Sequence, residues 1–309
     1  MGLLDGLTVP MVTPMSAPGE PSAPAAGPLL RALAKAGVTR LMLLGSNGEG
    51  PLIRADRTGA FVRDVARLWR AIVPGGQILA NVTAPGTDEA LWRAGLVGEV
   101  DAYVLSPPTY FAHREDEVVA HFRALAALGT PVIAYNAPKY ATPLTASSAA
   151  AVADVPGVVG VKDSSGDPSL LAHLVSLSRT RPGFEVSQGA EGALADGLRA
   201  GAHGIVPGTA NLAPRLALDM LRAHHDGDDA LLDRLQDTTN RLTRIHAIRP
   251  GVPSVKAILA ARGLCPAHAA PPLAPCTDAQ IRELAGVIEP LDDAILPKED
   301  ASDRPEAAT

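Results

Sequence analysis

The sequence predicts an α/β protein, a (β/α)8 TIM barrel with a small helical C-terminal extension. Three observations support this fold class. Eight short apolar runs alternate with segments whose apolar residues recur at helical spacing, the chain has 309 residues, and no GxGxxG motif follows the first run. Alternating strands and helices indicate a parallel sheet, and this length suits one large α/β barrel.

The eight runs give the order of the expected elements. We expect strands within residues 6–14, 38–46, 76–83, 101–108, 131–138, 158–165, 184–190 and 203–211. Helices are expected between them, as in residues 54–73 and 114–129, where apolar residues lie three or four positions apart. Eight such units in about 210 residues favour a closed barrel over an open doubly wound sheet. The missing glycine motif further weakens the alternative of a dinucleotide-binding sheet.

The two ends of the chain are expected to depart from the regular alternation. Residues 16–28, which are rich in Pro, Gly and Ala, predict a loop between the first strand and the first helix. We assign the barrel to residues 1–212, and the last barrel helix with a helical C-terminal region to residues 213–292. Residues 293–309 are charged and poor in apolar side chains, and they predict a disordered tail.

Composition excludes several classes of partner. The formal net charge of −6 provides no basic surface for nucleic acid or for an anionic membrane. No apolar run approaches the roughly 18 residues of a spanning helix, and the N-terminus lacks the basic region of a signal peptide. Cys265 and Cys276 match no common metal-binding spacing. We therefore expect a cytoplasmic protein with free thiols that binds neither nucleic acid nor a membrane.

One lysine ends an apolar strand in a chain where lysine is rare. The sequence contains 22 Arg but only five Lys, and Lys162 directly follows the apolar residues 158–161. Unlike an arginine guanidinium, a lysine amine can lose its proton when it is desolvated and can then attack a carbonyl group. From this position alone, a strand-end lysine that reaches back to solvent is the simpler interpretation.

Polar residues gather at the expected carboxyl ends of the strands, where the active sites of such barrels lie. Tyr110, Tyr135 and Tyr140 stand there, and the chain has only four tyrosines. An amine at this end can attack a 2-keto acid to form an imine, which is an electron sink for making or breaking the adjacent C–C bond. A tyrosine hydroxyl can carry the protons. The glycine-rich turn around Ser46 and Asn47 can bind the carboxylate of the substrate.

Five motifs, in this order and spacing, resemble those of the dihydrodipicolinate synthase / N-acetylneuraminate lyase family. They are GSNGEGPL, SPPTYF, YNAP, GVVGVKDSSGD and GTANLAPRL, and the likeness covers about residues 5–290. The resemblance implies a (β/α)8 barrel with a helical C-terminal region and a homo-oligomer, either a tetramer or a dimer. It also implies a Schiff-base lysine at Lys162 and a catalytic tyrosine at Tyr135.

The same resemblance implies further site residues. Ser46 and Asn47 stand where the family often has two threonines, and Ser46 and Tyr110 are expected to assist Tyr135 in catalysis. In the synthases of the family, the tyrosine that matches Tyr110 reaches into the site of a neighbouring subunit. The other residues expected to border the substrate are Ser164, Gly189, Val206 and Tyr140.

Two departures from the family pattern concern the second substrate. Dihydrodipicolinate synthases carry an arginine that holds the carboxylate of the aldehyde, and this chain has Tyr140 at that position. Thr109 replaces a tyrosine of the family. The segments GSNGE and KDSSGD are closer to the 4-hydroxy-2-oxoglutarate aldolase and 2-keto-3-deoxy-sugar-acid aldolase branches.

We therefore predict a class I aldolase or lyase that makes or cleaves a C–C bond between pyruvate and an aldehyde. Tyr140 suits a hydroxylated or neutral aldehyde, and neighbouring Lys139 is a weaker candidate for holding a carboxylate. A dihydrodipicolinate synthase that condenses pyruvate with aspartate semialdehyde is the alternative.

Two further classes compete with this hypothesis. A cofactor-using TIM barrel is disfavoured because the sequence has neither a dinucleotide motif nor a cluster of His and carboxylate residues at metal-binding spacing. A catalytically silent family member is disfavoured because Lys162 and Tyr135 are both retained. We expect no metal and no organic cofactor, since the imine itself serves as the electron sink.

Overall fold

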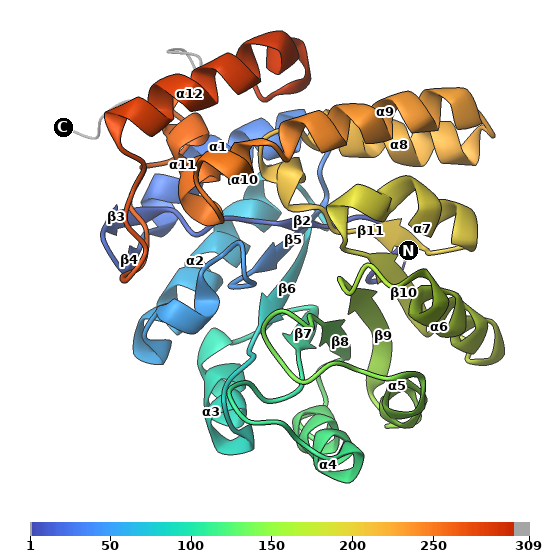
Figure 1. Ribbon diagram of the computed structural model, residues 1–309. Helices are drawn as coiled ribbons and strands as arrows, with labels where there is room; N and C mark the ends of the chain where they lie inside the picture. Colours follow the sequence, from blue (N-terminus) through green and yellow to red (C-terminus); the bar gives the residue numbers. More distant parts are fainter. Residues whose placement is uncertain (1, 300–309) are drawn as a thin grey trace.

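The computed structural model describes residues 2–299 and contains the predicted barrel (Figure 1). Nine strands in these residues form one parallel sheet in the order β1-β11-β10-β9-β8-β7-β6-β5-β2. The first predicted run supplies both β1 and β2, which pair with β11 and β5 respectively, so that the sheet closes on itself. The strands are β1 Gly6–Leu7, β2 Val9–Pro10, β5 Arg40–Leu43, β6 Gln77–Asn81, β7 Ala102–Leu105, β8 Val132–Asn136, β9 Val158–Asp163, β10 Glu185–Gln188 and β11 Gly204–Ile205.

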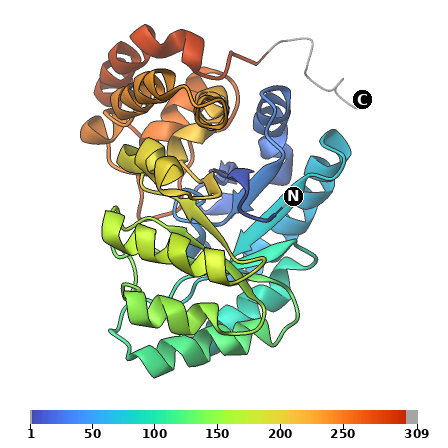
Figure 2. The same ribbon diagram turned by 90° about the vertical axis from the view of Figure 1, so that its right-hand side faces the viewer.

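Helices follow the strands and surround the barrel (Figure 2). In α2 the buried side chains include Phe61, Val65 and Trp69, which lie four residues apart and face the sheet. None of the helices described between residues 2 and 299 is long and apolar enough to cross a membrane. The barrel helices are α1 Ala23–Lys35, α2 Ala55–Ile72, α3 Thr87–Val97, α4 Glu115–Ala126, α5 Ala146–Ala153, α6 Pro168–Thr180, α7 Leu194–Ala200 and α8 Pro214–His225.

Two separate apolar clusters form the core of the protein. The larger one packs the outer faces of the strands against the helices. The smaller one fills the inside of the barrel and includes Tyr135 and Val206 together with Met42, Leu79 and Ile133. Because side chains fill the inside of such a barrel, ligands are bound at its end and not in a channel.

The amino-terminal end of the barrel is closed by a buried arginine. Arg40 donates from its guanidinium to Gln77 Oε1 and to the carbonyl oxygens of Gly2 and Asp5, each at 2.7 Å. Glu185 accepts a hydrogen bond from the backbone amide of Leu4 at 2.6 Å. These contacts fix the N-terminal segment across the bottom of the barrel and leave the carboxyl ends of the strands for chemistry.

The loop predicted for residues 16–28 is wrong over most of its length. Residues Met15–Ala17 (β3) and Glu20–Pro21 (β4) form a small antiparallel hairpin, and α1 already begins at Ala23. Ser22 caps α1 by accepting a hydrogen bond from the amide of Ala25. Pro24 occupies the first turn, where the missing N–H costs nothing because that group has no helical partner. Pro24 therefore marks the start of the helix, and Pro28 is accommodated inside it.

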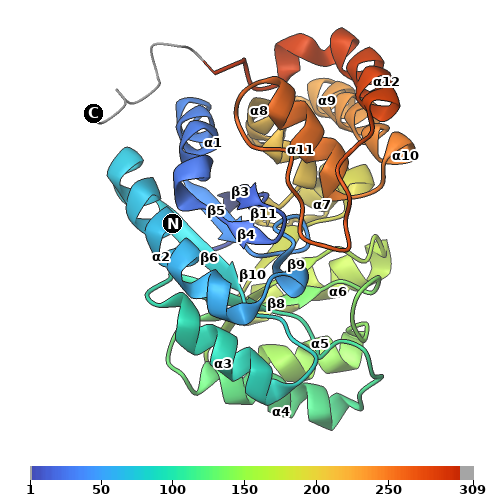
Figure 3. The same ribbon diagram turned by 90° about the vertical axis from the view of Figure 1, so that its left-hand side faces the viewer.

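The C-terminal part of the described chain is helical but contains one extended segment. Its helices are α9 Asp229–Leu242, α10 Ile245–Ile248, α11 Val252–Ala261 and α12 Asp278–Ile288, followed by the 3-10 helix Glu289–Ala294. Residues 262–277 join α11 to α12 and run down beside the β3–β4 hairpin (Figure 3).

The predicted range of the disordered tail, residues 293–309, includes residues that are ordered in the structure. Ile295 and Leu296 are buried, and the amide of Leu296 donates to the carbonyl of Leu212 at 2.7 Å. Residues 293–299 therefore pack against the barrel, because two apolar side chains interrupt the charged stretch. Residues 300–309 lie outside the described part of the chain.

Candidate active site

Lys162 lies inside the carboxyl end of the barrel on β9. It is directly opposite Tyr135 on β8 and Ser187 on β10 in the sheet. Its side chain is only 3% exposed, and its Nζ atom lies 4.3 Å from the centroid of the Tyr135 ring. This distance is within the range of a cation–π contact. Lys162 therefore does not reach solvent, and the interpretation of a strand-end lysine that reaches back to solvent is wrong.

Lys162 has no acidic partner. Within residues 2–299, no carboxylate forms an ion pair with its amine. The neighbouring Asp163 is tied elsewhere, since its carboxylate accepts hydrogen bonds from Asn136 Nδ2 at 2.7 Å and from Ser165 Oγ at 2.9 Å. Burial raises the pKa of Asp163 above its ordinary value. Asn136 also accepts from the amide of Leu144 at 3.0 Å, which fixes the loop after β8.

Tyr135 is the hydroxyl group next to this amine. Its Oη lies 3.3 Å from Ser46 Oγ, and either group can donate the hydrogen bond. Burial alone raises the pKa of the Tyr135 phenol, whereas the charge of Lys162 lowers it. Hydrogen bonds with Ser46, Ser164 and Lys162 lower it further, and the net pKa falls below the ordinary value. Tyr135 is thus suited to exchange protons with neighbouring groups.

Gly189 makes room for the reactive lysine. A Cβ atom at this position would lie 2.2 Å from Ser164 Oγ and 2.9 Å from Lys162 Cε. Both distances are shorter than real Cβ contacts, so any side chain would displace the amine or the serine. The backbone amide of Gly189 also donates to the carbonyl of Asp163 at 2.6 Å. The predicted role of Gly189 at the site therefore has a steric basis.

Backbone strain concentrates around the mouth of the barrel. In residues 2–299, Leu44, Glu49 and Tyr110 are the non-glycine residues with positive φ angles, at 60°, 56° and 81°. Leu44 and Glu49 flank the turn after β5, and Tyr110 lies in the loop after β7. Such conformations are costly for residues with a Cβ, and they cluster at functional sites. Their common location agrees with the position of Lys162.

A second buried lysine supports the turn after β5. Lys256 on α11 places its Nζ 2.5 Å from Glu49 Oε1, and both side chains are almost completely buried. Lys256 also donates to the carbonyl of His268, and Glu49 accepts from the amide of Ala270, both at 2.6 Å. The pair thereby connects the Ser46 turn to residues 262–277, which cross from the C-terminal helices to the barrel mouth.

A cavity of about 410 Å³ opens at the barrel mouth beside Tyr135. Of the predicted site residues, it brings together Ser46, Tyr135 and Tyr140. Lys162, whose amine lies over the Tyr135 ring, is next to this cavity but does not line it. Thr109 also lines it. The other lining residues, which the sequence did not single out for this role, are Glu49, Pro51, Leu52, Asn81, Thr83, Ser106, Ala137, Gly251, Val252 and Leu273.

Six predicted residues do not line this cavity. Lys162, Ser164 and Gly189 lie close to one another, and the other three lie elsewhere. Tyr110 is 88% exposed and borders a neighbouring surface groove of about 360 Å³, which Tyr140 also borders. The Asn47 side chain lies against Gly208, across the barrel mouth. Val206 is buried in the inner core of the barrel. Sequence reasoning did not identify Lys256 or Leu273 as parts of the site. The rarity of lysine was the only sequence signal for Lys256, and no motif near Leu273 indicated its place in the cavity.

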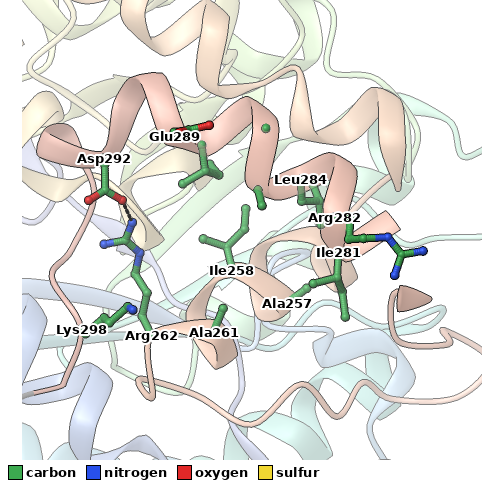
Figure 4. A pocket seen from close by; sticks show the side chains of 13 residues that line it. Ala257, Ile258, Ala261, Arg262, Ile281, Arg282, Leu284, Glu289, Asp292 and Lys298 are labelled. Atoms are coloured by element: carbon green, nitrogen blue, oxygen red, sulfur yellow. Dashed lines mark hydrogen bonds and ion pairs between the residues drawn. The ribbon is translucent and has the colours of Figure 1, made fainter. Parts of the chain in front are cut away.

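A larger cavity, of about 760 Å³, lies between α11 and α12 and has a different character (Figure 4). Its floor is formed by Ile258, Ile281 and Leu284, and the Arg262–Asp292 ion pair stands at its rim. No strand end contributes to it. Within residues 2–299, no group of three or more His, Cys, Asp or Glu side chains is arranged to hold a metal ion.

A closed α/β barrel with a buried, unpaired lysine beside a tyrosine hydroxyl is the arrangement of an imine-forming carbon–carbon lyase. The model of the dihydrodipicolinate synthetase family matches residues 3–290. The chain belongs to this family and is a pyruvate-dependent carbon–carbon lyase. The resemblance predicted from the five motifs is thus confirmed at the level of the family.

Individual relatives agree with this assignment. The chain is 28% identical over 280 residues to a 4-hydroxy-tetrahydrodipicolinate synthase of Neisseria meningitidis, covering 89% of this chain and 94% of the relative. It is 31% identical over 264 residues to an uncharacterized DapA-like lyase of Halobacterium salinarum, covering 84% of this chain and 85% of the relative.

The fold also matches solved structures of the family. The prophage protein YagE of E. coli K12, crystallised with pyruvate, superposes with a TM-score of 0.87 at 24% identity, covering 94% of this chain and 99% of YagE. Dihydrodipicolinate synthase of Thermotoga maritima gives a TM-score of 0.85 at 23% identity, covering 93% and 98%. These likenesses confirm the predicted TIM barrel with its C-terminal helices.

Proposed function

We propose that Lys162 forms the imine with pyruvate and that Tyr135 moves the protons of the reaction. The carrying observation is the position of the Lys162 amine, buried without a carboxylate partner and 4.3 Å above the Tyr135 ring. A carboxylate at that distance would hold the amine in its charged form, which is not nucleophilic. Within residues 2–299 no such carboxylate lies beside Lys162, and its polar neighbours are hydroxyl groups.

The reaction then follows from the chemistry of the imine. The amine attacks C2 of pyruvate, and loss of water gives the imine. Removal of a proton from C3 gives an enamine, whose C3 attacks the carbonyl carbon of the aldehyde, and the new alkoxide takes up a proton. Water finally releases a 4-hydroxy-2-oxo acid and regenerates Lys162, and cleavage runs through the same steps in reverse. Tyr135 and Ser46 together supply and remove the protons at oxygen.

The turn after β5 is the proposed site of the pyruvate carboxylate. Among residues 2–299, the backbone amides of Ser46, Asn47 and Gly48 have no hydrogen-bond acceptor, whereas the next amide, of Glu49, donates to Ser46. Consecutive free amides attract anions. Ser164 and Gly189 are proposed to border the methyl and keto groups, since they lie close to the end of the lysine side chain. Val206, in the inner core of the barrel, is proposed to border the same groups.

The second substrate separates the two candidate activities. A pyruvate aldolase other than a dihydrodipicolinate synthase remains our preferred assignment because Tyr140, which lines the cavity, offers a neutral hydroxyl where a synthase has an arginine. The relatives named as 4-hydroxy-tetrahydrodipicolinate synthases keep the alternative of aspartate semialdehyde in consideration. Tyr110 is 88% exposed, which fits a homo-oligomer, a tetramer or dimer, in which this ring enters a neighbouring site. The two free thiols suit a cytoplasmic location.

The test is reductive trapping. Pyruvate and borohydride should add one reduced pyruvyl group to the peptide that contains Lys162, as read by intact and peptide mass. Lys162→Ala should abolish the addition. Labelling of another lysine, or labelling that persists in the Ala variant, would contradict the assignment. The catalytically silent alternative predicts no labelling of the wild-type protein at all.

A further inference from the structure

The cavity beside Tyr135, in which the aldehyde would bind, has no free positive charge among its described lining residues. Of the residues that line it within the described chain, none is a lysine or an arginine, and Glu49 is the only charged one. Glu49 is already engaged by Lys256 and by the amide of Ala270. The side chain of Lys139 is exposed, and its Nζ lies 5.6 Å from the centroid of the Tyr140 ring. Lys139 does not line the cavity. A desolvated carboxylate would therefore find no charged partner there.

Three neighbouring polar side chains of the cavity, Asn81, Thr83 and Ser106, are already hydrogen-bonded within the protein. Thr83 Oγ donates to Asn81 Oδ1 at 2.8 Å and accepts from the amide of Ser106 at 2.9 Å. Asn81 Nδ2 donates to the carbonyl of Leu44 at 2.9 Å, and Ser106 Oγ donates to the carbonyl of Pro107 at 2.8 Å. Every side-chain donor of Asn81, Thr83 and Ser106, except one amide hydrogen of Asn81, therefore already has an acceptor within the protein. A polyhydroxylated aldehyde would have to compete with these bonds.

The opposite wall of the cavity is apolar and belongs to separate parts of the chain. Pro51 and Leu52 follow the turn after β5, Tyr140 follows β8, and Val252 and Leu273 come from the C-terminal region. Leu52 is 42% exposed and Tyr140 is 54% exposed, so both leave apolar surface uncovered toward the cavity mouth. Apolar surface that converges from three segments on one cavity is suited to a hydrophobic ligand.

From this lining we infer that the second substrate is an uncharged aldehyde with a hydrophobic body, aliphatic or aromatic. The inference rests on the proposed function, because the aldehyde must meet the enamine formed on Lys162. Its carbonyl faces Tyr135 and Ser46, while its body lies between Leu52, Tyr140 and Leu273. Addition of C3 of the enamine and uptake of one proton give a 4-hydroxy-2-oxo acid with an apolar substituent. This class differs from both carboxylated and sugar aldehydes.

The substrate panel should compare pyruvate addition to hexanal, benzaldehyde, glyceraldehyde, glyoxylate and aspartate semialdehyde, with pyruvate trapping measured in parallel. We expect kcat/KM for hexanal or benzaldehyde to exceed that for the other three by about 10-fold or more. If pyruvate is trapped on Lys162 but a polar or carboxylated aldehyde is preferred, or hydrophobic aldehydes do not react, the inference fails and the proposed function stands. If pyruvate is not trapped, the proposed function fails as well.

Two matched variants sharpen the result. Leu52→Asn should lower the ratio of kcat/KM for hexanal to that for glyceraldehyde by about 10-fold, because it removes apolar surface from the cavity. Leu128→Asn is the control, since Leu128 is similarly exposed, at 47%, and lies after α4, outside the cavity. An unchanged ratio in Leu52→Asn, or an equal change in Leu128→Asn, would contradict a role for this wall in aldehyde selection.

Discussion

Lys162 and Lys256 are both withdrawn from solvent, and their surroundings are opposite. Lys162 is the next-to-last residue of β9 and lies among hydroxyl groups and the ring of Tyr135, without a carboxylate partner in residues 2–299. Lys256 lies on α11 and is in ion-pair contact with the buried carboxylate of Glu49. The same side chain therefore has the proposed role of a nucleophile in one place and forms a buried ion pair in the other.

The difference lies in what replaces water around the amine. Burial disfavours a charged base, and an opposite charge at contact distance favours it again. His121 on α4 illustrates the first effect, because burial lowers its pKa to about 4 and no carboxylate of the described residues pairs with it. Lys256 has a carboxylate, that of Glu49, at contact distance, whereas Lys162 has none within residues 2–299.

The largest effect is expected at the nucleophile. Lys162→Arg should be inactive in carbon–carbon bond formation, because a guanidinium is not a usable nucleophile at neutral pH. The rate of aldol formation or cleavage measures this directly. Lys256 cannot compensate, so a Lys162 variant that retained substantial turnover would overturn the distinction between the two lysines.

Exhaustive treatment of the wild type with EDTA should leave turnover unchanged.

The next largest effect is expected at the proton carrier. Tyr135→Phe should lower kcat by about 10²–10⁴-fold, the usual contribution of general acid–base catalysis. Binding of pyruvate should weaken much less, because the ring remains beside Lys162. Steady-state kinetics with pyruvate as the varied substrate separates the two quantities. A variant with normal kcat and altered KM would make Tyr135 a positioning group.

Breaking the structural pair should cost stability. Lys256→Met leaves the Glu49 carboxylate buried without its cation, which typically lowers the free energy of unfolding by about 3–5 kcal/mol. The double variant Glu49→Gln/Lys256→Met should regain part of this loss, and urea unfolding of the two single variants and the double variant completes the cycle. The protein that remains folded should still be labelled by pyruvate. Equal stability of Lys256→Met and the wild type would show that the pair is not structural.

Protonation of His121 should destabilise the protein at acidic pH. Its folded pKa of about 4 lies below the unfolded value of 6.5, so the unfolded state takes up the proton first as the pH falls. The stabilisation is complete above pH 6.5 and is lost between pH 6.5 and 4. It amounts to about 3 kcal/mol. Unfolding of His121→Gln across this range should show a flatter pH dependence, while the exposed control His224→Gln should follow the wild type.

The smallest expected effect is a change of selectivity. Tyr140→Arg places a permanent cation on the cavity wall and gives a carboxylated aldehyde a bidentate partner. We expect the specificity for aspartate semialdehyde relative to hexanal to rise by roughly 10–150-fold, since a charge-assisted contact contributes about 1.5–3 kcal/mol. Tyr140→Gln, which adds hydrogen-bonding groups without charge, is the control. A similar rise in both variants would remove charge from the explanation.

The fold and the centre of the site could be predicted because their signals are local. Each strand is a short apolar run, and Lys162 and Tyr135 lie next to the ends of two consecutive strands, which are neighbours in a parallel barrel. The support of the site could not be predicted in this way. Glu49 and the amide of Ala270 are 221 residues apart in sequence. Leu273 lies in a proline-rich segment with no periodicity, so only the folded chain brings it to the cavity.

The wall contributed by Gly251, Val252 and Leu273 also has a consequence for the order of synthesis. β11, the last strand of the barrel, ends at Ile205, far upstream of these three residues. A chain leaving the ribosome folds from its N-terminal end, so Lys162, Tyr135 and all the barrel strands emerge before the residues that narrow the cavity. On our proposal, the nascent enzyme therefore has its imine-forming lysine in place first, and its discrimination among aldehydes requires the chain to be made as far as Leu273.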